Sequence, residues 1–491
     1  MQDQPIPARP ITAGPLPDRS KSNIIPRAIY VLTAALACLL IIYTVGKAYT
    51  TSFTIDESFS YLNIKTFFVR IIHMQHKENL TTISLELNRI TGLFSANTHI
   101  LNSLMMAVSS AIFGDSELSL RLPNLAAHVL FLYYSFKFLR HALPAKAFLL
   151  AFIIVNTNPF VLDFFSVARG YGLAISLMMM SLYHLYIYEK DSTHKKAHRK
   201  SYIFAMLAVY ANFTLFNYYI SLLILDGILS FQLSGKSLSG LFKRFREKDK
   251  ALLAVNIIFM LVTLGLLTLL QKGKQFYVGS GGFFSGSIPS LITDSLYRKS
   301  YPVYIFRTIY LCVLSAASIL SIGLCTTIYR HHRINGKFIP FILMLFSVLS
   351  CWIQHLLCKT PFPESRTGIY LVVLFTVGVV LIFPSENKYW QKTYILSIAF
   401  AAVFSVANLY RAVNFKYVLG WELVIRTFPE LLSCFEEGRT DITRFEEWKA
   451  RWKCRLCIHT GYEFCQSTTD SQPSFRAHTI PGYQYHLIFP V

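Results

Sequence analysis

The first apolar run of the chain reads Ala28-Ile-Tyr-Val-Leu-Thr-Ala-Ala-Leu-Ala-Cys-Leu-Leu-Ile-Ile-Tyr-Thr-Val-Gly46 and contains no charged side chain. A helix needs about 20 apolar residues to cross the hydrocarbon core of a bilayer, and this run meets that length. A cleaved signal peptide is the alternative. However, the polar lead of residues 1–27 is long for one, and no small-x-small cleavage site follows the run. We expect residues 28–46 to be an uncleaved first span with a cytoplasmic N-terminal tail.

Similar apolar runs recur as far as residue 410. The chain of 491 residues is 53% hydrophobic and 15% charged, whereas a soluble chain carries about 25% charged residues. We therefore predict an all-α polytopic membrane protein with about eleven transmembrane helices. The predicted spans are residues 28–46, 119–138, 147–164, 171–188, 202–216, 218–233, 252–271, 303–328, 338–356, 368–385 and 393–410.

The basic residues behind the formal net charge of +21 gather in short connections between these runs. The connections are Lys137–Lys146, Lys190–Lys200, Lys236–Lys250, Arg330–Lys337 and Lys388–Lys392. Such clusters are typical of cytoplasmic loops and suit anionic lipid head groups, so they argue against a nucleic-acid partner. With eleven spans every cluster falls on one side, which places the N-terminus inside and the C-terminus outside.

The outer side then holds a large first loop, residues 47–118, and the C-terminal segment, residues 411–491. The first loop contains another apolar stretch, His99–Phe113. It is short for a span, and counting it as one would put the basic clusters outside. We expect a juxtamembrane or re-entrant helix there. The predicted organisation is a tail (1–27), a transmembrane domain (28–410) and a small extracytoplasmic domain (411–491).

The cysteines fall into two groups. Five lie in or beside spans and are expected to be small apolar fillers: Cys38, Cys312, Cys325, Cys351 and Cys358. Four lie in the tail: Cys434, Cys454, Cys457 and Cys465. An oxidising outer compartment favours disulfides for this second group, and zinc is the alternative because His459 follows Cys457.

Two acidic residues, Asp56 and Glu57, stand just beyond the first span. Acids at this depth are costly unless they are solvated or paired. Thr54 and Glu57 have the spacing of a capping box, which would open an interfacial helix near Ser58. This interpretation explains Glu57 and leaves Asp56 as a candidate catalytic residue.

Further polar residues fall at other outer helix ends. The candidates are His99, Arg121, Asp163, Arg169, Tyr171, Lys274, Glu364 and Arg366. Each also has an ordinary structural interpretation: a snorkelling Arg at position 121, an ion pair between Asp163 and Arg169, or a local pair between Glu364 and Arg366. Gly170 and Gly172 would permit close backbone approach to a ligand.

Taken together, these residues bring acids, a histidine and several arginines to one face. Arg binds phosphate oxygens bidentately. A site with cations for a phosphate and one acid for a hydroxyl proton suits a lipid-phosphate sugar donor.

Four segments stand out in order along the chain. They are the acidic pair after the first span, residues 113–123 (Phe-Gly-Asp-Ser-Glu-Leu-Ser-Leu-Arg-Leu-Pro), residues 159–172 (Pro-Phe-Val-Leu-Asp-Phe-Phe-Ser-Val-Ala-Arg-Gly-Tyr-Gly) and residues 363–367 (Pro-Glu-Ser-Arg-Thr). Together these segments resemble the GT-C superfamily of membrane glycosyltransferases. The resemblance is to the branch of protein O-mannosyltransferases and lipid A aminoarabinose transferases (glycosyltransferase family 39-like), in its bacterial form.

The resemblance implies inverting transfer from a polyprenyl-phosphate sugar to a protein, lipid A or glycan hydroxyl at the inner membrane. It gives Asp56 the role of base, with Glu57 in support. It also implies that Arg169 and Arg366 bind the donor phosphate and that Arg121 braces the first loop. His99 matches a histidine that many relatives follow with two prolines, whereas this chain has Ile100 and Leu101. No cofactor is firmly implied; the family varies in metal use, and no compact metal-ligand set stands out.

Two other classes stay open. A secondary transporter or a flippase for lipid-linked sugars would place polar residues near the bilayer midplane and show inverted repeats. We find no internal repeat, and the polar candidates lie at the outer mouth. A non-catalytic assembly subunit that keeps the scaffold is the third possibility, and the presence of Asp56 argues against it.

Overall fold

The computed structural model describes residues 26–51, 99–233, 250–272, 279–299, 301–331, 334–382 and 387–415, with Phe53, Thr54, Asp56, Glu57, Ser60 and Tyr61 from the first loop. The chain divides into two compact units, residues 1–425 and 426–491, and every described residue belongs to the first. The predicted C-terminal domain overlaps the described residues only at 411–415, so its four cysteines lie outside them.

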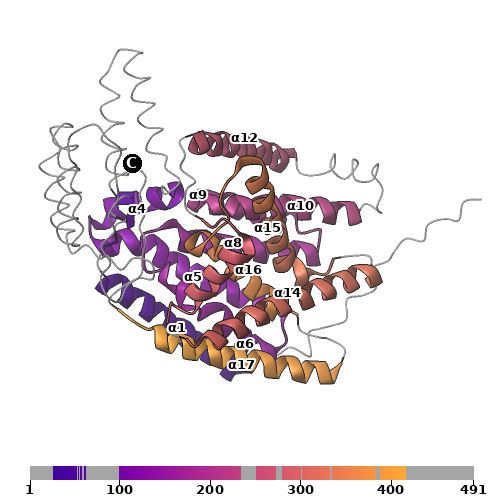
Figure 1. Cartoon of the computed structure of the whole chain (residues 1–491). Coiled ribbons are helices and arrows are strands. Elements are labelled where there is room, and N and C mark those ends of the chain that lie inside the picture. The colour runs from indigo at the N-terminus through magenta and orange to yellow at the C-terminus, as the bar shows by residue number, and fades with distance from the viewer. Residues whose placement is uncertain are drawn as a thin grey trace, which may run out of the picture. The chain divides into compact units, whose positions relative to one another are not determined.

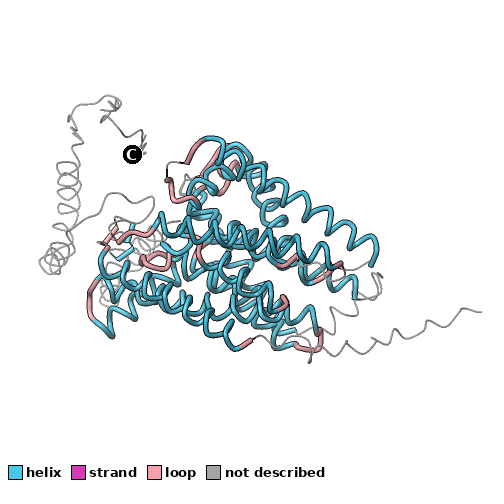
Figure 2. Tube along the Cα trace, turned by 90° about the horizontal axis from the view of Figure 1, so that it is seen from below, coloured by secondary structure: helices cyan, strands magenta, loops and turns pink. Residues whose placement is uncertain are grey.

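Helices and loops make up the part of the chain that the structure describes, and Figure 2 shows no strand there. The first half contains α1 (Arg27–Thr50), α4 (Ile100–Phe113), α5 (Glu117–Ala142), α6 (Ala145–Asn156), α7 (Pro159–Asp163), α8 (Gly170–Lys190), α9 (Lys195–Ala211), the short η1 (Phe213–Leu215) and α10 (Phe216–Leu233). The second half contains α12 (Lys250–Lys272), η2 (Phe283–Ser287), α13 (Ile288–Ser295), α14 (Val303–His331), η3 (Gly336–Phe338), α15 (Ile339–Cys358), η4 (Ser365–Gly368), α16 (Ile369–Val380) and α17 (Lys388–Ala412).

Each of the eleven predicted spans overlaps a helix, although the predicted span at 202–216 runs beyond α9, which ends at Ala211. Seven described helices are long and apolar enough to cross a membrane: α1, α8, α10 with η1, α12, α14, α15 with η3, and α17. The remaining predicted spans correspond to α5, α6, α9 and α16. The predicted juxtamembrane helix is α4, which has 14 residues and starts after His99.

The predicted span at residues 147–164 is wrong in one respect, because the helix is broken. α6 ends at Asn156, and α7 begins at Pro159. Proline lacks a backbone N–H and disfavours helical geometry in the residue before it. Asn158 instead caps α7, and its side-chain oxygen accepts a hydrogen bond from the Phe160 amide at 3.0 Å.

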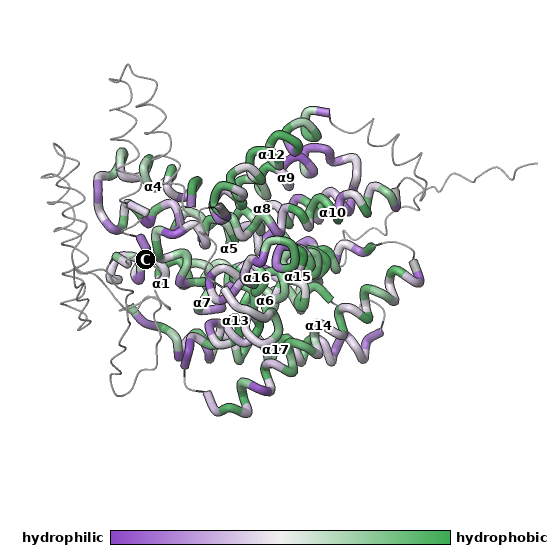
Figure 3. The backbone as a smooth tube through the Cα atoms, turned by 45° about the horizontal axis from the view of Figure 1, so that its top comes forward, coloured by the Kyte–Doolittle hydropathy of each residue, from purple (hydrophilic) through white to green (hydrophobic). Residues whose placement is uncertain are grey.

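The long helices differ in how much of their apolar surface the protein itself covers. In α8, 89% of the apolar stretch is buried inside the protein, whereas the corresponding share for α14 is 6%. α12 is also mostly uncovered, and Figure 3 shows the hydrophobic colour along much of it. Such apolar surface is stable in lipid and not in water. The chain is therefore an all-α polytopic membrane protein.

Helix packing brings distant segments of the chain together (Figure 1). α8 packs against α5 and α9, α4 lies against α5, and α1 also packs along α5. α10 packs on α15, which in turn contacts α16. As a result, the end of α1 and the beginnings of α4, α5 and α8 lie close enough for their side chains to interact.

The filler interpretation of the cysteines holds for Cys351, which is buried. Cys38, Cys312, Cys325 and Cys358 are exposed, so they do not fill the protein interior. They lie on helices whose apolar faces the protein leaves uncovered.

Candidate active site

The residues just beyond α1 form a tight turn that is built around Glu57. The Thr54 amide donates to Glu57 Oε2 at 2.8 Å, and the Glu57 amide donates to Thr54 Oγ1 at 3.2 Å. These are the two hydrogen bonds of the predicted capping box, which is thereby confirmed. The next turn continues with Ser60, whose hydroxyl donates to the Asp56 carbonyl at 3.0 Å.

Glu57 forms a fully buried ion pair with Arg121. Arg121 donates from Nε to Oε1 and from Nη2 to Oε2, both at 2.8 Å. Burial raises the pKa of Glu57, but the charge and hydrogen bonds of Arg121 outweigh it, so the net pKa is lowered. Both carboxylate oxygens are occupied by donors inside the protein, so the geometry gives Glu57 a structural part.

Arg121 also ties the end of α1 to α5. Its Nη1 donates to the carbonyls of Ala48 at 2.7 Å and Thr51 at 2.6 Å. Ala48 lies in the last turn of α1 and Thr51 is its C-cap, where helix carbonyls lack partners further along the helix. Arg121 therefore holds the end of α1 against α5.

The turn between α7 and α8 is held through both backbone groups of one residue, Ala168. The Ala168 amide donates to Glu57 Oε1 at 2.6 Å, and the Ala168 carbonyl accepts from Asn102 Nδ2 at 3.2 Å. Asn124 continues this buried network by donating to Asn102 Oδ1 at 2.8 Å. The network fixes the residue that follows Ala168, which is Arg169.

Asp56 lies between two arginines from distant parts of the chain. Arg366 Nη1 donates to Asp56 Oδ2 at 2.7 Å, and Arg169 Nη2 lies 3.8 Å from the same oxygen. Arg169 also donates from Nη1 to the Asp56 carbonyl at 3.1 Å and to Ser60 Oγ at 2.9 Å. The Arg169 side chain is 1% exposed, whereas those of Asp56 and Arg366 are 14% and 24% exposed. The charged pair of Asp56 and Arg366 is thus accessible from outside.

The loop before α16 sets the direction of Arg366. Glu364 and Thr367 form a capping box at η4, in which the Glu364 amide donates to Thr367 Oγ1 at 2.8 Å. Ser365 has φ +50°, which is uncommon for a residue other than glycine. Its amide donates to Ser290 Oγ at 2.8 Å, which holds the loop against α13. Glu364 therefore caps η4, and the Arg366 side chain points to Asp56.

The two glycines at the start of α8 make room for protein and not for a ligand. A Cβ on Gly170 would lie 1.9 Å from the Ala211 carbonyl oxygen and 2.6 Å from His99 Cβ. A Cβ on Gly172 would lie 2.4 Å from the Phe164 carbonyl oxygen. The expectation that these glycines admit a ligand is therefore wrong. They let His99 pack edge-on against the ring of Tyr171, with 4.8 Å between the ring centroids.

Asp163 belongs to a second buried network. Its carboxylate pairs with Lys47 from the last turn of α1, and the Tyr297 hydroxyl donates to its Oδ2 at 2.7 Å. Lys47 also donates to the Tyr297 oxygen at 2.9 Å, and Asn414 Nδ2 donates to it at 2.8 Å. An ion pair between Asp163 and Arg169 was one interpretation of the sequence, whereas in the structure Arg169 is directed to Asp56. The Asp163 network joins four segments away from that pair.

Replacing Tyr297 with Phe tests whether this second network stabilises the fold. The hydroxyl is bonded to both members of a buried ion pair, so its loss is expected to lower the free energy of unfolding by about 1.5–3 kcal/mol. Tyr301→Phe is a matched control, because it removes one neutral hydrogen bond to Asn408 at 2.9 Å and should cost about 0.5–1.5 kcal/mol. Equal losses measured by denaturant unfolding in detergent would contradict the special importance of Tyr297.

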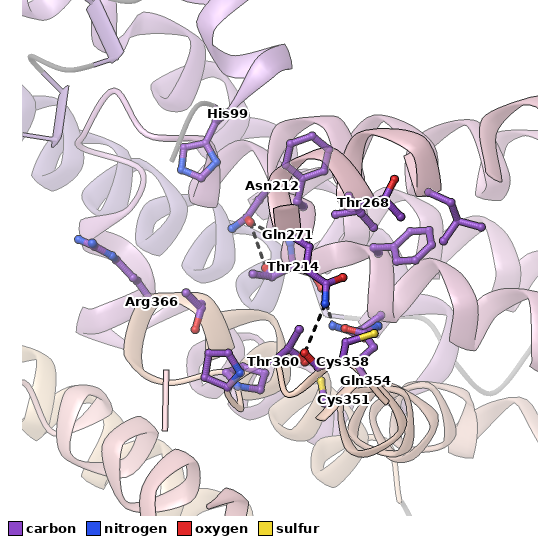
Figure 4. Close-up of a pocket in the computed structure, with 18 of the residues that line it drawn as sticks. His99, Asn212, Thr214, Thr268, Gln271, Cys351, Gln354, Cys358, Thr360 and Arg366 are labelled. Carbon is purple, nitrogen blue, oxygen red and sulfur yellow. Dashed lines mark hydrogen bonds between the residues drawn. The ribbon is translucent and has the colours of Figure 1, made fainter. Parts of the chain in front are cut away.

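A cavity of about 300 Å³ opens beside Arg366. Its wall combines a cation, a histidine, amide and hydroxyl side chains, and apolar residues from α12. Figure 4 shows His99, Asn212 and Arg366 around one part of it and Gln271, Gln354 and the two cysteines around another. The lining residues used below are His99, Tyr171, Asn212, Leu264, Leu267 and Arg366. A space of this size, apolar with a few polar groups, is typical of a small-molecule site.

The structure therefore brings together most, but not all, of the predicted residues. Asp56, Arg169 and Arg366 meet, and His99 and Tyr171 line the adjoining cavity. Asp163 and Glu364 have other partners, and Lys274 lies outside the described residues. Lys47 and Asn212 were not among the predicted residues. A lysine in the last turn of an apolar helix was the available signal for Lys47.

The fold and these buried charges define a multi-helix membrane protein with a polar cavity beside an arginine-bound carboxylate. No protein-family model matches the sequence, and no curated protein matches it. The chain is similar to a crystal structure of ArnT from Cupriavidus metallidurans bound to undecaprenyl phosphate. That TM-score is 0.41 at 11% identity, over 77% of this chain and 64% of that one.

The apo-state crystal structure of the same protein gives a TM-score of 0.34 at 12% identity, over 72% of this chain and 77% of that one. The first match spans less than two thirds of the ArnT chain. A likeness at this identity and TM-score does not define an activity, which has to rest on the side chains of this chain.

Proposed function

We propose that this protein is a membrane glycosyltransferase of the GT-C type that moves a sugar from a polyprenyl-phosphate donor to an acceptor hydroxyl. In this proposal the reaction takes place at the extracytoplasmic face of the inner membrane and inverts the anomeric centre. The observation that carries it is the carboxylate of Asp56, held by Arg169 and Arg366 at the edge of a mixed polar and apolar cavity.

The two arginines suit a phosphate group. An Arg guanidinium offers several N–H donors in a plane that matches phosphate oxygens. Arg366 is the more accessible of the two, and its partner in the structure is a carboxylate oxygen. A donor phosphate that enters the cavity can replace that carboxylate on Arg366, while Arg169 stays anchored to Ser60 and the Asp56 carbonyl.

Asp56 is the proposed base. In the reaction the acceptor oxygen attacks the anomeric carbon, the bond from that carbon to the phosphate oxygen breaks, and polyprenyl phosphate leaves with the bonding electrons. The acceptor proton goes to the Asp56 carboxylate. Phosphate is already a good leaving group, so the site has to stabilise its charge and to remove one proton, and it contains groups for both tasks.

The apolar part of the cavity suits the lipid of the donor. Leu264 and Leu267 of α12 line it, and α12 is mostly uncovered by protein. A polyprenyl chain could therefore reach the cavity from the membrane along this helix. The polar groups at the Arg366 end would then meet the phosphate and the sugar.

Replacing Arg366 with Gln is expected to lower kcat/KM for the donor by about 10- to 100-fold, because a charged hydrogen bond is worth about 1.5–3 kcal/mol. The measurement is the donor dependence of the transfer rate. Arg140→Gln is the control, since Arg140 is an exposed cation in the last turn of α5. An unchanged kcat/KM in Arg366→Gln would rule out its proposed contact with the donor phosphate.

The experiment that tests the function is transfer by the purified protein from a radiolabelled polyprenyl-phosphate sugar to acceptor hydroxyls of a protein, lipid A or a glycan. Formation of a labelled product supports the proposal. The alternative, a secondary transporter or a flippase for lipid-linked sugars, predicts movement of intact donor across proteoliposomes without a new glycosidic bond, and that result would contradict the proposal.

A further inference from the structure

Two buried polar atoms in the cavity wall have no hydrogen-bond partner in the structure. They are His99 Nε2 and Asn212 Nδ2, and their residues are 3% and 4% exposed. Both residues line the same cavity as Arg366. Buried polar groups are normally paired, so two unpaired ones facing one cavity indicate that a ligand supplies the missing partners.

The orientation of the Asn212 amide is fixed by the chain. Asn212 Oδ1 accepts hydrogen bonds from the Thr214 amide and from Thr214 Oγ1, both at 3.1 Å. In this way Asn212 caps η1. Because the oxygen is committed to the backbone, Nδ2 is the group left for the cavity, and it can only donate. Figure 4 shows this amide nitrogen facing the space between His99 and Arg366.

The protonation state of His99 is also constrained. Its ring is hydrogen-bonded to the backbone of Ala211, the residue before Asn212. Since Nε2 has no partner, that bond uses Nδ1, and a ring that donates from Nδ1 keeps a lone pair on Nε2. Burial, and then the charge of Arg169, lower the pKa of His99 well below its usual value, although Asp56 raises it. His99 is therefore neutral at pH 7 and offers an acceptor.

The fold holds these two side chains rigidly beside each other. Ala211 is the last residue of α9. Gly170 lies against both the Ala211 carbonyl and the His99 side chain, so these two groups are neighbours. Tyr171 packs edge-on against the His99 ring. Neither His99 Nε2 nor Asn212 Nδ2 forms a hydrogen bond with Asp56 or Arg366.

We infer that His99 and Asn212 form a hydroxyl-recognition pair, in which His99 Nε2 accepts from and Asn212 Nδ2 donates to hydroxyl groups of the bound sugar substrate. A hydroxyl is uncharged and can satisfy both groups, because its O–H donates and its oxygen accepts. The inference rests on the proposed function and makes Asn212 a specificity-determining residue of that site. The hydroxyls belong either to the donor sugar or to a sugar of the acceptor.

The decisive variants are Asn212→Ser and His99→Phe. Serine can keep the cap of η1 while it removes the amide donor. Phe keeps an aromatic ring against Tyr171 while it removes Nε2, together with the Nδ1 bond to Ala211. Asn335→Ser is the matched control, because Asn335 caps η3 through the Lys337 amide at 3.1 Å and is exposed away from the cavity. All variants are first compared with wild type by thermal unfolding in detergent.

The readout is discrimination between each natural sugar and its monodeoxy analogues, measured both as kcat/KM and as binding through a ligand-induced shift in Tm. Wild type should disfavour one deoxy analogue by about 10- to 100-fold, because the missing hydroxyl leaves a buried donor or acceptor unpaired. Asn212→Ser or His99→Phe should lose that preference, and Asn335→Ser should keep it. A preference lost among deoxy donors assigns the pair to the donor sugar, and one lost among deoxy acceptors assigns it to the acceptor.

Two results separate the inference from the function on which it rests. If transfer proceeds but Asn212→Ser and His99→Phe discriminate as wild type does, the recognition pair is wrong and the glycosyltransferase stands. If no transfer occurs but the variants lose discrimination in binding, the pair stands and the glycosyltransferase is wrong. A uniform loss of activity with every analogue would also overturn the pair, because a general packing defect has that signature.

Discussion

Replacing Asp56 with Asn is expected to lower kcat by about a thousandfold, within the 10²- to 10⁴-fold range that a general base contributes. Asparagine has nearly the same shape, and its side-chain oxygen can still accept the hydrogen bond from Arg366. It cannot take the acceptor proton. Because the carboxylate is 14% exposed and Arg169 keeps its bonds to Ser60 and the backbone, Tm should change little.

Asp191→Asn is the control for this substitution. Asp191 is an exposed carboxylate at the end of α8, where it accepts from the Thr193 amide and hydroxyl. It should transfer sugar at the wild-type rate. Equal transfer by folded Asp56→Asn and wild type would remove Asp56 from the chemistry and leave its arginine contacts with a structural role alone.

Replacing Arg121 with Met should have the largest effect on stability. It leaves Glu57 fully buried without its cation and frees the carbonyls of Ala48 and Thr51. Breaking a buried pair in this way costs about 3–5 kcal/mol, a large fraction of the stability of a typical domain. We expect a lower midpoint of denaturant unfolding, with partial recovery in the double variant Arg121→Met/Glu57→Gln, which removes the stranded charge.

The same pair predicts a dependence on pH. The pKa of Glu57 is lower in the folded protein, so the unfolded chain binds the proton more tightly. The stability that Glu57 contributes is therefore complete above its unfolded pKa of about 4.3 and is lost as the pH falls through the lower, folded pKa. The difference in stability between wild type and Glu57→Gln should shrink over that acidic window. A constant difference would show that the pair adds nothing through its charge.

Much of this fold follows from hydropathy. Apolar runs of spanning length predicted a helix at each position. An amphipathic pattern with a period of 3.6 residues was not needed for that prediction. The break at Asn158 and Pro159 was missed, although both residues are known boundary signals, because the residues on either side of it are mostly apolar.

The candidate site could be predicted where its chemistry is local. Thr54 and Glu57 form a capping box within four residues, which separates Glu57 from Asp56 before any tertiary contact is considered. The meeting of Asp56 with Arg366 was expected only from the shared outer face of their helices. Asn212 could not be found in this way. Its free donor depends on Thr214 occupying its oxygen and on the packing of Gly170 that brings His99 beside it.

The role of Asp56 as the base is tested most directly by measuring donor binding and sugar transfer on the same Asp56→Asn sample. Asp56 competes with a donor phosphate for Arg366, so its neutralisation should leave the affinity for polyprenyl phosphate unchanged or increase it. Transfer of labelled sugar should fall about a thousandfold in the same protein. We expect retained binding with lost transfer. Wild-type transfer by Asp56→Asn would show that Asp56 is not the base.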